Sequence, residues 1–370
     1  MKPAKKRLVS LDAFRGISIA GMILVNNPGT WSYVYPPLEH AEWHGWTPTD
    51  LIFPFFLFII GVAMTFSFAK RLSAVENKRP LYIKIVRRSL ILFGLGLFLN
   101  GFPFYNFETI RIPGVLQRIA VVYFFAAIIT LNTHLRGQAW AAGILLFLYW
   151  ALMKLIPVPG LGAGHLSMDG NLAAYIDNAL LHGHIYRETW DPEGILSTIP
   201  AIATTLCGVL VGHLIRSKKE KSDIVGWIFV IGWGAIVVGL VWDIWFPINK
   251  NLWTSSYVVF TAGAALQFLG VCYWLIEVKG WRRWALPAVI YGMNSIAVFV
   301  LSGLVARILL LIKVNNSNAT PITLKGWMYH NLFASWAGPF NGSLAFAITN
   351  ILFWLGLMAI LYRKQIFIKI

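Results

Sequence analysis

The chain has 370 residues, of which 58% are hydrophobic and only 12% are charged. Soluble domains are about 45–50% apolar and about 25% charged, so this composition excludes an ordinary soluble enzyme, a disordered chain and a nucleic-acid-binding module. It indicates a polytopic membrane protein. The net charge of +16 is therefore considered first as a signal of membrane topology, because Lys and Arg collect in cytoplasmic loops.

Ten apolar stretches have the length of about 20 residues that a helix needs to cross a bilayer. They lie at residues 9–29, 49–69, 82–101, 114–132, 137–156, 194–215, 224–245, 254–276, 284–312 and 343–362, and the ninth is long enough to be tilted or broken. Asp12 and Arg15 interrupt the first stretch, so we interpret it as a retained span rather than a signal peptide. The sequence predicts an all-α polytopic integral membrane protein with about ten transmembrane helices, forming one domain over residues 1–370.

Basic residues are distributed unevenly over the junctions between these stretches. Most of the 31 Lys and Arg fall at the N-terminus and in every second connection, and few fall on the opposite side. This asymmetry predicts that both termini are cytoplasmic. Cys207 and Cys272 lie inside apolar runs and imply no disulfide framework. Because His, Cys and Asp nowhere cluster with the spacing of metal ligands, we expect no metal.

Several polar residues lie inside the apolar stretches, where charge is costly and usually faces a bundle interior or a wet cavity. Asp12 and Arg15 are three residues apart and can pair on one helical face. Arg15 and Asn26 are close to three turns apart and lie on nearly one stripe. Gln117 and Arg118 lie about one turn into the fourth stretch. One interpretation is that these residues line a cavity, in which Arg118 anchors an anionic or carbonyl group. The alternative is that Asp12 and Arg15 are a neutralised pair, Asn26 caps the helix and Arg118 snorkels outward.

The loop before the second stretch carries His40 between carboxylates. Glu39 and Glu42 flank it, and Asp50 follows at the start of the stretch. A histidine beside carboxylates is a candidate general base, because its proton equilibrium lies near neutral pH. Asp50 could orient this histidine or simply cap the following helix. Taken alone, a histidine in such a loop is more often only solvated or hydrogen-bonded.

Blocks in order over almost the whole chain resemble the heparan-alpha-glucosaminide N-acetyltransferase family. These are residues 7–16, 25–26, 40–47, 50–54, 111–118, 191–196, 247–254 and 291–296. The chain resembles the short bacterial form, without the extra N-terminal lumenal region and first span of the lysosomal enzyme. The resemblance implies a multi-pass protein of the bacterial cytoplasmic membrane and makes a homodimer plausible.

The family resemblance also implies a reaction and two site residues. The reaction moves an acetyl group from cytosolic acetyl-CoA to the amine of a terminal glucosamine on the far side of the membrane. The catalytic histidine corresponds to His40, and the asparagine associated with the active site corresponds to Asn26. The stretch at 28–37 is a few residues longer than in the lysosomal enzyme, which indicates that the acceptor side of the pocket differs.

This chemistry suggests roles for the residues around His40. An amine attacks a thioester only when it is neutral, so His40 would remove its proton. Asn26, or else Gln117, would stabilise the oxyanion, and Asp50 or Glu42 would hold the imidazole tautomer. The expected catalytic set is His40, Asn26 and Asp50. We favour direct transfer over an acetyl-histidine intermediate, because an exposed acyl-imidazole would hydrolyse.

Further polar residues are candidates for binding the two substrates. The phosphates of acetyl-CoA need cationic partners, and the donor-side candidates are Arg15, Arg87, Arg88, Gln117 and Arg118. Carboxylates, amides and aromatic faces hold sugars, and the acceptor-side candidates are Glu42, Asp191, Glu193, Asn249, Trp253 and Asn294. The alternatives are that the basic residues determine topology and that the tryptophans anchor the chain at the membrane interface.

Two other functions fit part of the pattern. A transporter of a sugar or anionic metabolite also needs charged residues in a membrane cavity, but it does not need one indispensable histidine in a loop. An O-acetyltransferase of envelope polysaccharide would use a sugar hydroxyl in place of the amine. The partners expected in the leading reading are a glucosamine-type acceptor and membrane lipid, with no nucleic acid.

Overall fold

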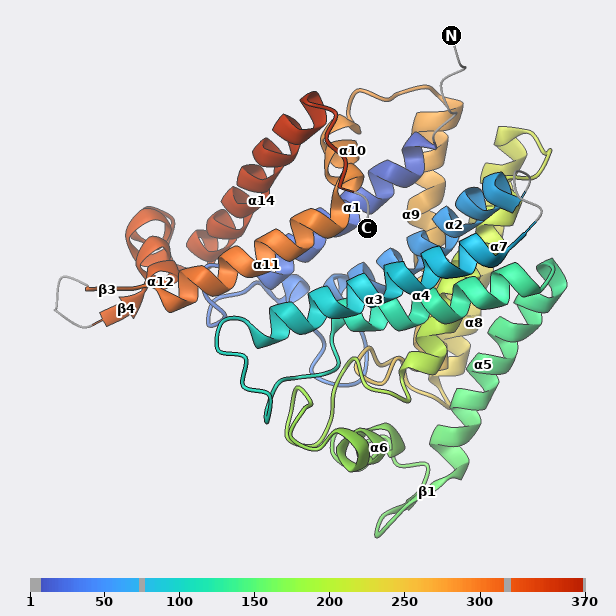
Figure 1. Ribbon diagram of the computed structural model, residues 1–370, viewed down its shortest axis with the longest axis horizontal. Coiled ribbons are helices and arrows are strands. Elements are labelled where there is room, and N and C mark those ends of the chain that lie inside the picture. The colour runs from blue at the N-terminus through green and yellow to red at the C-terminus, as the bar shows by residue number, and fades with distance from the viewer. Residues whose placement is uncertain (1–7, 73–76, 316–320, 369–370) are drawn as a thin grey trace. The chain divides into compact units, whose positions relative to one another are not determined.

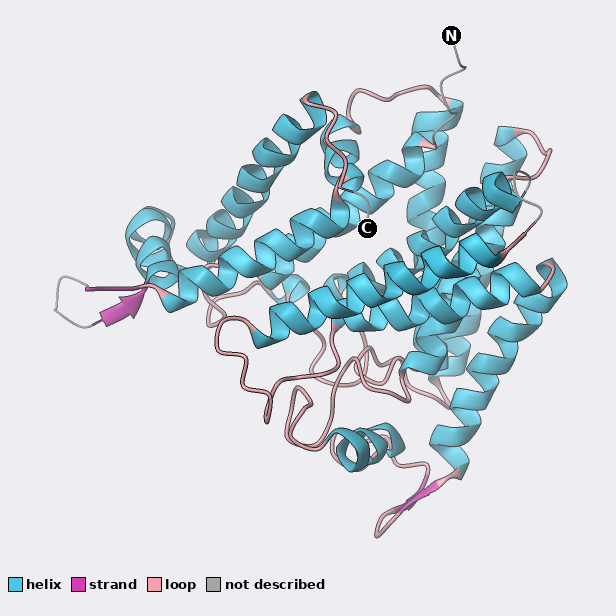
Figure 2. Cartoon of the chain, in the orientation of Figure 1, coloured by secondary structure: helices cyan, strands magenta, loops and turns pink. Residues whose placement is uncertain are grey.

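The computed structural model describes residues 8–72, 77–315 and 321–368, and these are overwhelmingly helical (Figures 1 and 2). The longer helices are α1 (Val9–Asn26), α2 (Ile52–Leu72), α3 (Arg79–Gly101), α4 (Val115–Asn132), α5 (Leu135–Leu155), α6 (Leu172–Leu181), α7 (Thr198–Ile215), α8 (Lys221–Asp243), α9 (Ser255–Tyr273), α10 (Leu286–Met293), α11 (Ser295–Leu311) and α14 (Pro339–Arg363). This confirms the predicted all-α polytopic class.

The remaining elements are short. Two 3₁₀ helices, η1 (Pro36–Leu38) and η2 (Pro48–Leu51), precede α2, and the π-helical segments η3 (Trp274–Val278) and η4 (Tyr329–Ala334) extend α9 and α12 (Leu324–Met328); α13 covers Ser335–Ala337. Strands β1 (Pro157–Val158) and β2 (Gly162–Ala163) form one antiparallel hairpin, and β3 (Lys313–Asn315) and β4 (Pro321–Thr323) form another.

Each predicted membrane-spanning stretch coincides with a helix or a pair of helices. Within the described residues, eight helices are long and apolar enough to cross a membrane, and α10 with α11 makes a ninth if the bent pair is one span. The pair bends by 81°, so the long stretch at 284–312 is broken. The helix α3 occupies the expected third span but falls outside this set, because Lys84, Arg87 and Arg88 lie in its first half.

The chain divides into two compact units that interleave in sequence. The first unit draws its described residues from Met1–His40, Thr47–Phe53 and Val271–Lys369. The second unit contains Ala41–Trp46 and Pro54–Gly270. The assignment of residues 1–370 to a single domain stays a prediction.

In the first unit, α1 packs closely against α10. A Cβ at Gly16 would overlap the carbonyl oxygen of Ala288, and a Cβ at Gly292 would overlap the carbonyl oxygen of Asp12. The two backbones therefore touch, which is the contact that small residues permit between membrane helices. Helices α11 and α14 also pack on α1, so this helix is the centre of the first unit.

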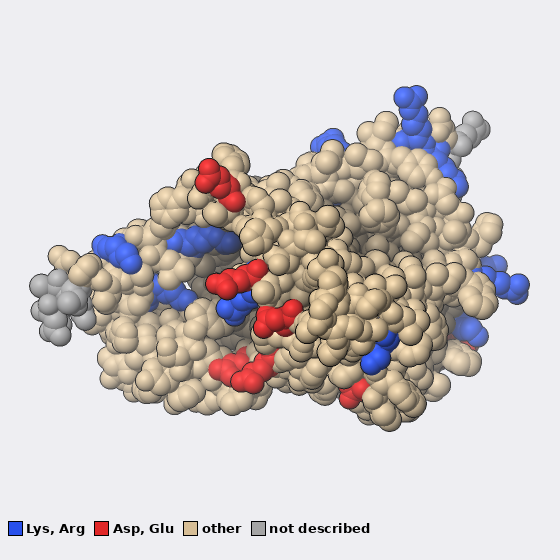
Figure 3. Space-filling model, turned by 90° about the horizontal axis from the view of Figure 1, so that it is seen from below, with Lys and Arg blue, Asp and Glu red and all other residues tan. Residues whose placement is uncertain are grey.

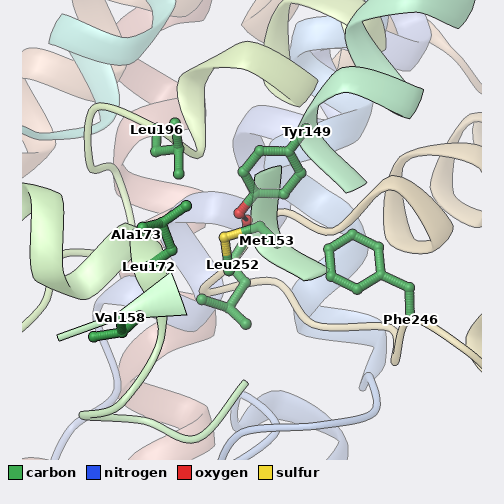
Figure 4. Close-up of a cluster of buried hydrophobic side chains, with 8 residues drawn as sticks. All are labelled: Tyr149, Met153, Val158, Leu172, Ala173, Leu196, Phe246 and Leu252. Carbon is green, nitrogen blue, oxygen red and sulfur yellow. Dashed lines mark hydrogen bonds between the residues drawn. The ribbon is translucent and has the colours of Figure 1, made fainter. Parts of the chain in front are cut away.

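In the second unit, a buried apolar cluster fixes the long loops that follow α5 and α8 (Figure 4). Its members are Tyr149, Met153, Val158, Leu172, Ala173, Leu196, Phe246 and Leu252. The hydroxyl of Tyr149 donates a hydrogen bond of 2.5 Å to the carbonyl oxygen of Leu252, so the one polar atom in the cluster is satisfied. The cluster holds the segments that carry residues 191–197 and 247–254 in fixed positions.

Candidate active site

His40 and Asp50 form a hydrogen-bonded pair in the first unit. The Nδ1 atom of His40 lies 2.6 Å from Oδ1 of Asp50. The Asp50 side chain is 1% exposed, whereas that of His40 is 45% exposed. If Nδ1 donates its proton to the carboxylate, the lone pair of the imidazole lies on Nε2. The pair thus has the arrangement of a general base held by a buried carboxylate.

The local sequence explains why Asp50 is fixed. Thr47 is the N-cap of η2 and Pro48 occupies its first position, where a missing N–H costs nothing. The backbone N–H of Thr47 donates to Oδ2 of Asp50 at 3.0 Å, which completes a capping box. The hydroxyl of Thr47 donates to the carbonyl oxygen of Glu39 at 2.6 Å and so ties the residue before His40 to the same turn. Asp50 therefore both caps the turn and orients the histidine, which the sequence had left as alternatives.

Asn26 is the exposed last residue of α1, in the same unit as His40. Its neighbour Asn27 is buried and donates from Nδ2 to the carbonyl oxygen of Ile23 at 3.0 Å, so Asn27 rather than Asn26 caps the helix. The amide of Asn26 remains at the surface, where a substrate can reach it. Its role as the oxyanion donor stays a prediction.

The predicted pair of Asp12 and Arg15 is present in α1. The Nη1 atom of Arg15 lies 3.2 Å from Oδ1 of Asp12 and also donates to the carbonyl oxygen of Gly292 at 3.4 Å. Arg15 therefore fastens α1 to α10 and neutralises a buried carboxylate. Asn294 lies at the break between α10 and α11, and both its amide atoms bind the segment after α14, through the carbonyl oxygen of Ile366 and the N–H of Ile368.

The segment that follows His40 belongs to the second unit and is pinned there by aromatic side chains. Trp43 donates from Nε1 to the carbonyl oxygen of Leu166 at 2.7 Å. Trp46 packs on Phe260 with ring centroids 4.8 Å apart. Glu42 between them is exposed.

His44, in the same segment, faces a buried amide. Its Nδ1 lies 3.4 Å from Nδ2 of Asn249, and burial lowers the pKa of His44, with the charge of Asp243 opposing this. Asn249 is itself fully buried, and its Oδ1 accepts from the backbone N–H of Leu252.

Arg111 binds two carboxylates of the second unit at once. It makes a bidentate pair with Asp191 at 2.8 and 2.7 Å, and its Nη2 donates to Glu193 at 2.5 Å. Burial alone would lower the pKa of Arg111, but the hydrogen bonds and charges of Asp191 and Glu193 raise it above its usual value. Arg111 also stacks on the ring of Tyr186, at 4.7 Å. The two carboxylates predicted to bind a sugar are thus already paired with an arginine.

Arg118 is enclosed in the second unit rather than reaching outward. It is 2% exposed, donates to the carbonyl oxygen of Gly194 at 3.1 Å and to the hydroxyl of Ser197, and lies over the ring of Trp253 at 5.1 Å. Among the residues that the structure describes, Nε and Nη1 of Arg118 and Nε2 of buried Gln117 have no hydrogen-bond partner. Buried donors of this kind are costly unless another group binds them.

The other donor-side and acceptor-side candidates differ in access. Arg87 is exposed on α3, and the guanidinium of its neighbour Arg88 lies over the ring of Tyr123 at 4.6 Å. Trp253 is 1% exposed and donates from Nε1 to the hydroxyl of Thr204 at 3.0 Å. Arg87 therefore offers its charge to solvent, whereas Trp253 presents no free face.

Asp177 lies beside Gly194, but it was not among the site residues predicted from the sequence. It is buried on α6 and accepts a hydrogen bond of 2.8 Å from the backbone N–H of Ile195. Burial raises the pKa of Asp177 to about 7, and the hydrogen bond from Ile195 opposes the shift. A Cβ at Gly194 would overlap this carboxylate, so only glycine fits there. The sequence feature that could have identified Asp177 is the presence of an aspartate inside a short apolar helix.

The described residues contain no group of three or more His, Cys, Asp or Glu side chains that could hold a metal ion. Figure 3 shows a face on which most atoms belong to uncharged residues, with acidic side chains near a few basic ones. The fold and this site define a class: an all-α, multi-pass membrane protein that carries a buried aspartate and an accessible histidine in a loop between spans.

Comparison with known proteins places the chain within that class. Residues 7–241 match the family described as "Heparan-alpha-glucosaminide N-acetyltransferase, catalytic". The chain is 33% identical to the heparan-alpha-glucosaminide N-acetyltransferase of Homo sapiens, over 80% of this chain and 52% of the relative. It is 32% identical to the enzyme of the same name from Mus musculus, over 81% of this chain and 54% of the relative. The chain belongs to this family, and it spans about half the length of these curated relatives.

Proposed function

We propose that this protein is a transmembrane N-acetyltransferase. It transfers the acetyl group of acetyl-CoA to the amine of glucosamine, or of a saccharide that ends in glucosamine, on the opposite side of a bacterial cytoplasmic membrane. Membership of the family supports the reaction class. The observation that carries the assignment to residues is the contact of 2.6 Å between His40 and buried Asp50.

His40 removes the proton from the acceptor amine in this proposal. The protonated amine has no lone pair, so the attack on the thioester carbonyl requires a base near neutral pH. Asp50 holds Nδ1 and stabilises the imidazolium that forms when Nε2 accepts the proton. As the C–S bond breaks, the proton is available for the departing thiolate. Asn26, exposed at the end of α1, donates to the oxyanion of the tetrahedral intermediate.

The donor-side residues divide into accessible and enclosed groups. Arg87 is exposed and carries the charge that the phosphates of the donor require, whereas Arg15 is already paired with Asp12. Gln117 and Arg118 keep buried N–H groups without partners among the described residues, which suits a carbonyl or amide oxygen of the donor. We assign Arg87, Gln117 and Arg118, which all belong to the second unit, to donor binding, and Arg88 to packing against Tyr123.

The test uses the purified full chain in detergent with labelled acetyl-CoA and glucosamine. We expect N-acetylglucosamine from the wild type and a loss of roughly 10²- to 10⁴-fold in kcat for His40→Ala, with an unchanged melting temperature. His182→Ala is the matched control, because His182 is also exposed in a loop, and its side-chain partner among the described residues is Asn178. Equal activity of His40→Ala and wild type would remove His40 from the mechanism.

Two further measurements separate this proposal from its alternatives. Vesicles that accumulate sugar without acetylating it would indicate a transporter. Product found only with hydroxyl acceptors would indicate an O-acetyltransferase.

Incubation with acetyl-CoA alone, followed by mass spectrometry of the peptide containing His40, distinguishes direct transfer from an acetyl-histidine. We propose direct transfer and a homodimer, so we expect no acetylated peptide and twice the chain mass in detergent.

A further inference from the structure

Three basic side chains lie on α11 and in the connection that follows it. They are Arg307 on α11, Lys313 on β3 and Lys325 on α12. The chain has no Asp or Glu after Glu277, so this region contains no acidic residue of its own. None of the three forms an ion pair with a described residue, and Arg307 donates from Nη1 to the carbonyl oxygen of Gly303 in its own helix at 3.1 Å. The region therefore carries uncompensated positive charge.

The backbone of the first unit brings these residues together (Figure 1). The N–H of Leu324 donates to the carbonyl oxygen of Ile312 at 2.8 Å. Lys313 and Lys325 are the next residues of the two segments, so they flank this hydrogen bond. Helix α12 packs on α11, where Arg307 precedes Ile312 by about 7–8 Å along the helix axis at 1.5 Å per residue. One small anionic group can therefore be reached by all three long side chains.

Lys325 is enclosed, although lysine is almost never buried without a partner. It is 9% exposed, and its Nζ lies 6.0 Å from the centre of the ring of buried Phe346. Burial lowers the pKa of Lys325 from its usual value. A lysine that snorkels would turn its charge outward and be exposed. A buried cation without a counter-charge is costly, so an anionic group that binds beside Lys325 would stabilise the fold.

The connection between α11 and α14 lies near a membrane surface. Helix α14 is long and apolar enough to cross a membrane, and α11 is the second half of the bent pair. A connection between two such helices lies at the depth of the lipid headgroups. Trp336 on α13 is 73% exposed, which fits this depth because tryptophan collects at membrane interfaces.

Apolar side chains next to the cations indicate the class of ligand. Ile308, Leu311 and Ile312 are exposed, and they adjoin Arg307 and Lys313 in the chain. Inorganic phosphate would compensate the positive charge but would leave this apolar surface uncovered. An uncharged lipid would cover the surface but leave the charge. An anionic phospholipid does both, and basic pockets between membrane helices bind such headgroups.

We propose that the end of α11 and helix α12 form a binding site for one anionic phospholipid. The side chains of Arg307, Lys313 and Lys325 bind the phosphate of the headgroup, and an acyl chain covers the exposed apolar face of α11. The inference does not depend on the proposed acetyl transfer.

The test compares melting of the full chain in nanodiscs of phosphatidylcholine and in nanodiscs of an equal mixture with phosphatidylglycerol. We expect phosphatidylglycerol to raise the melting temperature of the wild type, because a ligand of the folded state stabilises it. Lys325→Met should melt at or above the wild type in phosphatidylcholine, since it removes an uncompensated buried cation, and should gain little from phosphatidylglycerol. Lys325→Arg retains the charge and should retain the gain.

Lys279→Met is the matched control. Lys279 also belongs to the first unit and lies against a ring, that of Trp274 at 5.3 Å, but it is exposed. The control should gain as much from phosphatidylglycerol as the wild type does. Native mass spectrometry of the detergent-purified chain, titrated with phosphatidylglycerol, measures the affinity for the first lipid bound. We expect this affinity to fall roughly fivefold or more in Lys325→Met.

Three results would overturn the lipid site. If Lys325→Met melts below the wild type by the same amount in both membranes, Lys325 has a structural role that no lipid shares. If Lys279→Met loses as much affinity as Lys325→Met, the attraction is that of any basic surface for an anionic membrane. If inorganic phosphate raises the melting temperature in phosphatidylcholine as much as phosphatidylglycerol does, the site holds a soluble anion instead of a lipid.

Discussion

Two aspartates, one in each unit, have nearly the same surroundings and different consequences. Asp50 and Asp191 are both buried, and each pairs with one basic side chain; Asp50 also accepts from the backbone N–H of Thr47, and Asp191 from those of Tyr186 and Glu193. The basic partner of Asp50 is His40, and that of Asp191 is Arg111. A guanidinium stays charged at every relevant pH, whereas an imidazole gains and loses its proton near pH 7. We therefore expect the partner to decide whether a buried carboxylate supports the fold or supports proton transfer.

Replacing the carboxylate of the first pair gives the largest expected effect. Asp50→Asn keeps an oxygen for the N–H of Thr47 but can present its amide N–H to Nδ1 of His40. The imidazole then carries its proton on Nε2, the wrong nitrogen for a base. We expect kcat to fall by roughly 10²- to 10⁴-fold with little change in melting temperature. Single-turnover acetylation of glucosamine measures this, and a variant that keeps the wild-type rate would show that the tautomer is irrelevant.

Breaking the pair of Arg111 and Asp191 should lower the stability of the fold rather than the catalytic rate. Arg111→Gln leaves Asp191 and Glu193 buried without their cation, so the folded state should lose roughly 3–5 kcal/mol. The melting temperature in detergent falls, while kcat per folded molecule stays near the wild-type value.

Arg187→Gln is the matched control for this change. Arg187 stacks on the same ring, Tyr186, at 5.0 Å, and its side chain is exposed. If the two variants melt at the same temperature, the ion pairs of Arg111 contribute nothing to stability. If Arg111→Gln melts normally but loses catalysis, the contrast between the two aspartates is wrong.

The elements that sequence predicts well are those set by local spacing. Asp12 and Arg15 pair because they are three residues apart on one helix, and Thr47 with Asp50 forms a capping box within four residues. The apolar stretches predict the helices for the same reason. Even the broken ninth stretch has a local signal, since 284–312 is too long for one straight span, and Asn294 lies at the break.

The contacts that sequence does not predict join distant segments. Arg111 meets Asp191 across 80 residues and Arg118 meets Gly194 across 76, and no spacing rule connects such positions. Asp191, Glu193 and Trp253 look like sugar ligands in the sequence because of their chemistry alone. The structure shows the two carboxylates bound to Arg111 and the indole buried against Thr204. Burial and partners, rather than residue type, decide which polar groups a substrate can reach.

Asp177 extends the comparison, because it is a buried carboxylate without a direct basic partner among the described residues. Burial raises its pKa from 3.8 to about 7. The folded protein thus keeps the proton up to about pH 7, while the unfolded chain releases it near pH 4. The folded state binds more protons in this window, so the contribution of Asp177 to stability decreases as pH rises from about 4 to about 7 and is constant above.

Asp177→Asn should remove this pH dependence, because the amide has the same shape and keeps an oxygen for the N–H of Ile195. We expect the variant to match the wild type near pH 4 and to melt at a higher temperature at pH 8, by a free energy on the order of 2–4 kcal/mol. Asp169→Asn, which changes an exposed carboxylate in the segment before α6, should show no such difference. A gap between variant and wild type that stays constant from pH 4 to pH 8 would mean that the pKa of Asp177 is the same in the folded and the unfolded protein, so that burial does not raise it.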